Sequence, residues 1–222
     1  NMPEEDDKLI GEDAEIPEDL PEQEQEALFY AAQAVSTLHS PIALQAGQRE
    51  EIAFQYALQA FRLAPLHNSL LALLFSMCEI RGVSIFDVLT REEIEQALEK
   101  PENRKVTAIS VAKTLTGVRE AIIKGNRAVL PSTPAGIMLI EIIAKKEPTP
   151  TIKAILAMEY GSIGRHLEEL QLLKEAAEED TRYAHLYIEH SHFMQRYKEL
   201  IQYCERFNPT VRERIEVMVM EA

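Results

Sequence analysis

Apolar side chains recur at spacings of three and four residues through most of this chain, and a proline or glycine follows each run. Pro41 follows the run in residues 26–40, whose apolar stripe consists of Leu28, Ala31, Ala32, Val35 and Leu38. A stripe with this period lies on one face of an α-helix, and proline cannot continue the helix. Glycine, the weakest helix former after proline, makes up only 8 of the 222 residues. We therefore expect an all-α fold.

Capping residues predict where several of these helices begin and end. Thr90 and Glu93 have the capping-box spacing, and Thr149 precedes a proline at the first position of a helix. Asn68 is the expected N-terminal cap of an apolar helix that Gly82 ends, because glycine adopts the left-handed conformation at little cost.

The negative charge of the chain is concentrated at its N-terminus. Residues 1–26 hold 12 Asp or Glu and one Lys, whereas the remaining 196 residues carry a net charge of only −3. A segment so acidic and so poor in bulky apolar residues predicts a flexible tail, assigned here to residues 1–25. A local basic excess in residues 100–127 is a candidate receiver for an acidic partner or for this tail. It is not a basic stripe, and we expect no nucleic acid partner.

Cysteine usage and hydropathy suggest where the protein works. Cys78 and Cys204 lie far apart in apolar helical patterns, which is typical of buried thiols in a reducing compartment. No apolar run approaches the length of about 20 residues that a membrane-spanning helix needs. We expect a cytoplasmic protein that does not insert into membranes. The sequence also contains no phosphate-binding glycine loop and no Gly-x-Ser-x-Gly elbow, and we expect no cofactor.

The C-terminal part of the chain resembles itself in two consecutive segments. Residues 154–181 align without a gap on residues 184–211, with six identities that include Glu159 with Glu189. An interval of this length is typical of helical repeats, in which each unit is a pair of helices.

A second pattern lies in residues 53–82. Small residues at helical spacing precede a helix-ending proline and a second apolar helix, at Ala53, Ala57, Ala60, Pro65, Leu71, Leu74, Cys78 and Gly82. This arrangement resembles the tetratricopeptide repeat, in which small residues let two helices approach closely. The family's tryptophan is absent, and Phe75 stands where its first helix has a small residue. The resemblance implies an α-α superhelix.

The resemblance also implies a domain organisation and a function. An N-terminal repeat-like region at 26–100 is followed by connecting helices at 101–150 and a C-terminal repeat pair at 151–222. Helical repeats bind a peptide or an amphipathic helix on their open surface and carry no chemistry there. A compact, acidic protein of this kind is similar to the chaperones and adaptors of bacterial secretion systems. The resemblance therefore implies a non-enzymatic adaptor or chaperone that holds a partner protein.

Large polar and aromatic side chains that interrupt the apolar faces are the candidate partner-binding residues. They are Tyr56, His67, Tyr160, Tyr187, His190 and Tyr197. Core packing or a plain solvent position is the competing interpretation for each of them.

Two other functions remain open. Glu189 and His192 have the Glu-x-x-His spacing of helical metal sites, with His185 on the same helix face and Glu159 as a second carboxylate. This alternative is a helical metalloprotein, although the second half of such a site has no histidine in the repeat alignment. The other alternative is a structural subunit of a stable assembly, in which neighbouring subunits cover the most apolar helices.

Overall fold

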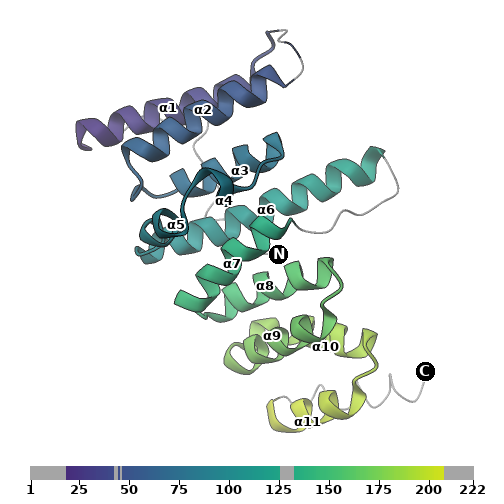
Figure 1. Ribbon diagram of the computed structural model, residues 1–222. Coiled ribbons are helices and arrows are strands. Elements are labelled where there is room, and N and C mark those ends of the chain that lie inside the picture. The colour runs from purple at the N-terminus through teal and green to yellow at the C-terminus, as the bar shows by residue number, and fades with distance from the viewer. Residues whose placement is uncertain (1–18, 43–44, 46, 126–132, 208–222) are drawn as a thin grey trace. The chain divides into compact units, whose positions relative to one another are not determined.

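The computed structural model describes residues 19–42, 45, 47–125 and 133–207 (Figure 1). These residues form eleven α-helices and a 3₁₀ turn, and no strand occurs among them. The expected all-α fold is confirmed. Residues 1–18 of the predicted acidic tail lie outside the described part, and residues 22–25 of the same prediction belong to the first helix, which begins at Glu22. No helix in the described ranges is long and apolar enough to cross a membrane.

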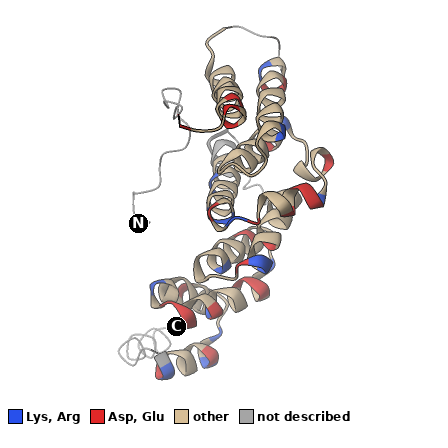
Figure 2. Ribbon diagram, turned by 90° about the vertical axis from the view of Figure 1, so that its left-hand side faces the viewer, with Lys and Arg blue, Asp and Glu red and all other residues tan. Residues whose placement is uncertain are grey.

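The chain divides into two compact units, which are described separately below. The first unit consists of residues 1–129 and 133–143, and the second of residues 130–132 and 144–222. Both acidic and basic positions occur among the helices, as the red and blue segments in Figure 2 show.

The first unit is built from helices that pack on their neighbours in the chain. Its helices are α1 (Glu22–His39), α2 (Gln48–Leu63), α3 (Leu70–Arg81), α4 (Ile85–Val88), α5 (Arg91–Ala97), α6 (Pro101–Gly125) and most of α7 (Pro134–Lys146). Helix α2 packs between α1 and α3, and α3 also packs on α6. Ala53, Ala57 and Ala60 are fully buried, as expected for small residues where two helices approach closely.

Most of the predicted caps are present. Thr90 and Glu93 form a complete capping box, and the Thr149 hydroxyl accepts a hydrogen bond from the Ile152 amide. Gly82 ends α3 in the left-handed conformation. The prediction for Asn68 is wrong, because Ser69 stands at the cap position with a φ of 75° and makes no side-chain cap bond.

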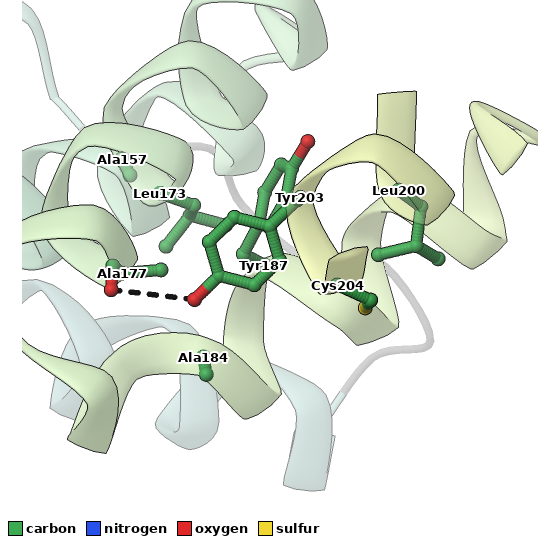
Figure 3. Packing of buried hydrophobic residues seen from close by; sticks show 8 residues of the cluster. All are labelled: Ala157, Leu173, Ala177, Ala184, Tyr187, Leu200, Tyr203 and Cys204. Atoms are coloured by element: carbon green, nitrogen blue, oxygen red, sulfur yellow. Dashed lines mark hydrogen bonds between the residues drawn. The ribbon is translucent and has the colours of Figure 1, made fainter. Parts of the chain in front are cut away.

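The second unit contains two consecutive helix hairpins. The first pairs α8 (Pro150–Ser162) with α9 (His166–Glu179), and after a 3₁₀ turn (Thr181–Tyr183) the second pairs α10 (Ala184–Phe193) with α11 (Tyr197–Phe207). Helix α9 also packs on α10, so the hairpins share one core. Figure 3 shows this core, which consists of Ala157, Leu173, Ala177, Ala184, Tyr187, Leu200, Tyr203 and Cys204.

One side-chain contact holds the first hairpin together, and another joins the second hairpin to it. The Lys153 ammonium on α8 lies 3.3 Å from the Glu175 carboxylate and also contacts that of Glu179, so one cation joins α8 to α9. The Tyr203 hydroxyl donates a hydrogen bond to the Ala177 carbonyl at 3.3 Å, which joins α11 to α9 (Figure 3).

The two hairpins match each other at a constant interval along the chain. Helix α8 ends at Ser162 and α10 at Phe193, and α9 begins at His166 and α11 at Tyr197. The left-handed residues of the two turns, Gly164 and Gln195, keep the same interval. The interval between equivalent residues of the two hairpins is therefore one residue longer in the structure than in the sequence alignment. Glu159 corresponds to His190 rather than to Glu189, and Glu169 corresponds to Leu200.

Candidate functional site

The second unit buries a carboxylate at a position where its other hairpin has a leucine. The Glu169 residue in the first turn of α9 is only 3% exposed, and its counterpart Leu200 in α11 is 1% exposed. At the interval that the structure gives, Glu169 and Leu200 both lie on the face of their helix that packs inward. A buried carboxylate is costly unless it is paired, so its partners decide what this position does.

Each of the two oxygens of this carboxylate lies close to a histidine side chain. Glu169 Oε2 lies 2.9 Å from Nδ1 of His166, one turn earlier on α9, and Oε1 lies 3.2 Å from Nδ1 of His190 on α10. A carboxylate only accepts hydrogen bonds, so Nδ1 of His166 donates to Glu169 and the His166 ring is held in one orientation, whereas His190 lies at ion-pair distance from the other oxygen. The carboxylate thus links α9 to α10.

Gly161 provides the space for this arrangement. A Cβ atom at residue 161 of α8 would overlap the carboxylate of Glu169. The buried carboxylate, the two histidines and this glycine come from three helices, and we call these four residues the Glu169 cluster.

Large apolar side chains are exposed beside the Glu169 cluster. Ile163, Leu167 and Phe193 are 37%, 60% and 73% exposed. All three lie where α8 and α10 end and α9 begins. The Phe193 ring meets the His166 ring edge-on, with 6.3 Å between the ring centroids. We call Ile163, His166, Leu167 and Phe193 the hairpin-end surface.

Four of the predicted partner-binding residues lie in the second unit. His190 belongs to the Glu169 cluster, and the Arg165 guanidinium stacks over the Tyr160 ring at 4.1 Å. Tyr197 meets His192 edge-on at 5.6 Å. Tyr187 is buried and packs edge-on against Tyr203, and burial raises the pKa of both hydroxyls. The structure therefore moves Tyr187 from the predicted partner surface into the core.

The other two predicted residues lie in the first unit. Tyr56 on α2 stacks on Tyr30 of α1 at 6.1 Å. His67 Nδ1 lies 2.7 Å from the Asn68 carbonyl oxygen in the turn before α3. Both side chains are half-buried.

The residues of the metal alternative do not form a ligand group. Glu159 is buried in α8, whereas Glu189 on α10 is exposed and His192 is half-buried. His185 is exposed and its Nδ1 lies 2.9 Å from the Arg182 carbonyl oxygen. Across the residues that the structure describes, no three His, Cys, Asp or Glu side chains are placed to hold a metal ion.

Sequence reasoning missed His166 and Glu169 as a pair. The segment Gly-Arg-His-Leu-Glu-Glu at 164–169 carries the signal, because a histidine and a glutamate three apart share one helix face. The sequence alignment, whose interval is one residue shorter, matches Glu169 with the exposed Glu199 instead of the buried Leu200. It therefore gave no sign that residue 169 is buried.

Comparison of the chain with protein-family models, curated proteins and solved structures found no match.

Proposed function

We propose that this protein binds a partner protein, without chemistry of its own, on the hairpin-end surface of its second unit. The partner segment is a peptide or an amphipathic helix that places apolar side chains on Ile163, Leu167 and Phe193. This is the holding role of an adaptor or a chaperone, which the helical repeat pattern also favours.

The observation that carries this proposal is the exposure of three large apolar side chains at one end of two helix hairpins. A single exposed leucine is ordinary, but neighbouring exposed residues that include a phenylalanine are typical of protein-binding surfaces. The His166 ring lies within this group and supports Phe193 edge-on.

The Glu169 cluster supports the proposal through the orientation of its His166 ring. Glu169 fixes the His166 ring through a hydrogen bond from Nδ1, so the part of the surface that contacts Phe193 is preorganised. A preorganised surface loses less conformational entropy when it binds. The function therefore gives a reason for a buried carboxylate where packing alone would select a leucine.

The size of the surface sets the expected strength of binding. Covering the exposed parts of these three side chains is worth on the order of 3 kcal/mol, at about 1.5–3 kcal/mol for each fully buried apolar side chain. This gain alone corresponds to a dissociation constant of several millimolar. We therefore expect a partner that also contacts neighbouring helices, and an interaction that is readily reversible.

Capture from an extract of the source organism tests the proposal when three forms of the full chain are compared. They are the wild type, the double variant Leu167→Ser/Phe193→Ser, and the control Leu66→Ser. Leu66 is also a large exposed apolar residue, but it lies in the first unit. We expect a protein that the wild type and the control retain and that the double variant loses at least ten-fold. Equal retention by all three forms, or no retained protein, would contradict the proposal.

A further inference from the structure

The first unit contains a small open pocket that the proposed function does not use. Three helices line it, α1 through Val35, α3 through Ala72, Leu73 and Ser76, and α6 through Ser110, Lys113 and Thr114, together with Ser69 before α3. Its volume is about 230 Å³. Lys113 is exposed and Val35, Leu73 and Thr114 are half-buried, so the pocket opens to solvent.

The volume of the pocket limits what it can hold. Sites for drug-sized ligands and cofactors measure about 300–1,000 Å³, whereas a cavity of about 150 Å³ holds a benzene molecule. A volume of about 230 Å³ lies between them and fits one or two aliphatic side chains.

The lining of the pocket is apolar and hydroxylic, with a cation at its edge. The Ser76 hydroxyl donates to the Ala72 carbonyl at 3.1 Å and lies 3.0 Å from the Thr114 hydroxyl, so these two polar groups pair with each other within the wall. None of the eight lining residues is acidic, and Lys113 is the cation among them. The pocket therefore fits an aliphatic side chain that has acidic neighbours.

Glu79 is the nearest acidic residue along α3, and it lies three residues beyond Ser76 and does not line the pocket. Residues 27–38 of α1 and 70–78 of α3 carry no charged side chain.

A segment with the matching chemistry lies in this chain. Residues 1–18 hold eight Asp or Glu and one Lys, and within them Leu9 and Ile10 form an adjacent aliphatic pair flanked by Asp6, Asp7, Glu12 and Asp13. A segment that served only to keep the protein soluble would need no such pair.

The segment is also long enough to reach the pocket. Val35 lies 13 residues beyond the start of α1 at Glu22, which is about 20 Å along the helix. The nine residues from Ile10 to Asp19 span up to about 30 Å when extended.

We infer that the pocket between α1, α3 and α6 binds the aliphatic pair Leu9–Ile10 of the chain's own acidic N-terminal segment. Lys113 attracts the acidic flanks while the aliphatic side chains enter the pocket. Because the segment is tethered, its effective concentration is in the millimolar range, and weak contacts keep the pocket occupied. This inference concerns the first unit and does not depend on the hairpin-end surface of the second.

A competition experiment with a free peptide tests the inference on the full chain. The probe is a fluorescent peptide of residues 4–13, EEDDKLIGED, and the double variant Leu9→Ser/Ile10→Ser removes the tethered competitor. We expect the peptide to bind the double variant at least ten-fold more tightly than the wild type. A peptide with the same two serine substitutions should not bind either protein.

Two lysines on α6 provide a matched pair of further variants. Lys113 lines the pocket and Lys105 does not, and both are exposed. In the Leu9→Ser/Ile10→Ser background, Lys113→Glu should weaken peptide binding at least five-fold and Lys105→Glu less than two-fold. Equal binding to the wild type and the double variant, no binding to the double variant at millimolar peptide, or equal effects of the two lysine variants would overturn the inference.

Discussion

The two hairpins of the second unit have nearly the same form but place different residues at one buried position. In the second hairpin, Leu200 fills this position and joins the apolar core. In the first hairpin, Glu169 fills it and depends on His166 and His190 for its partners. The second hairpin shows that the fold needs no polar group here. The carboxylate therefore requires an explanation other than packing, and orientation of the hairpin-end surface supplies one.

We expect the largest loss of stability when Leu200 of the second hairpin is replaced by glutamate, the residue at the corresponding position of the first hairpin. Leu200→Glu buries a carboxylate without histidine partners, and we expect it to lower the free energy of unfolding by about 3 kcal/mol or more. Urea denaturation followed by far-UV circular dichroism measures this change. Lys198→Glu, at an exposed position of the same helix, is the control and should change it by less than about 0.5 kcal/mol. A similarly small loss for Leu200→Glu would show that the position tolerates any charge.

A smaller effect is expected when the first hairpin loses the space for its carboxylate. In Gly161→Ala the new Cβ overlaps the Glu169 carboxylate, and we expect a loss of about 1 to 2 kcal/mol. In a Glu169→Ala background the same change should be neutral or stabilising, because alanine favours helix over glycine by up to about 1 kcal/mol.

A double-mutant cycle by urea denaturation gives the coupling between residues 161 and 169. Gly117→Ala is the control, since no atom lies within 4 Å of a Cβ placed there. Additive effects of the two substitutions would contradict the contact between Gly161 and Glu169.

The first hairpin also differs from the second in the ion pairs of Lys153. We expect the loss of these ion pairs to have the smallest effect on stability. The hydrogen bond to Glu179 is the main cause that raises the pKa of Lys153 above its ordinary value. Because both glutamates are partly exposed, we expect Lys153→Met to cost only about 0.5 to 1 kcal/mol at neutral pH.

The pH dependence of this difference follows from the direction of the shift. The raised pKa of Lys153 stabilises the folded protein fully when the pH is below the unfolded-state pKa of about 10.4. This stabilisation is lost as the pH rises through the higher pKa of the folded state. Urea denaturation of the wild type and Lys153→Met from pH 7 to pH 11 measures it. A difference that grows with pH would contradict the assignment.

Local sequence signals predicted much of the fold. The capping box at Thr90, the cap at Thr149 and the helix end at Gly82 depend on residues within one turn of each other, and all three are present. The cap at Asn68 failed because Ser69, the next polar residue, takes the cap position in a left-handed conformation. A choice between adjacent polar residues depends on the path of the chain, which a local pattern does not determine.

The candidate site was predicted only in part. His190 was singled out from the sequence, but its partner Glu169 lies on the preceding α-helix and meets it only because α9 packs on α10. An error of one residue in the interval between the two hairpins moves a side chain by about 100° around its helix, which is enough to exchange a buried position for an exposed one. Leucine and glutamate are too common in helices to fix the interval by their identities alone.

The most direct test replaces Glu169 of the first hairpin by leucine, the residue at the corresponding position of the second hairpin. Glu169→Leu removes the buried carboxylate and leaves His166 and His190, both partly exposed, to be hydrated. If Glu169 serves the hairpin-end surface, its replacement by an apolar residue of similar size should leave the free energy of unfolding within about 1 kcal/mol of the wild type, or raise it. Urea denaturation of the two proteins at pH 7 measures the difference. A loss of about 3 kcal/mol or more would show that Glu169 is needed for stability and would contradict this account.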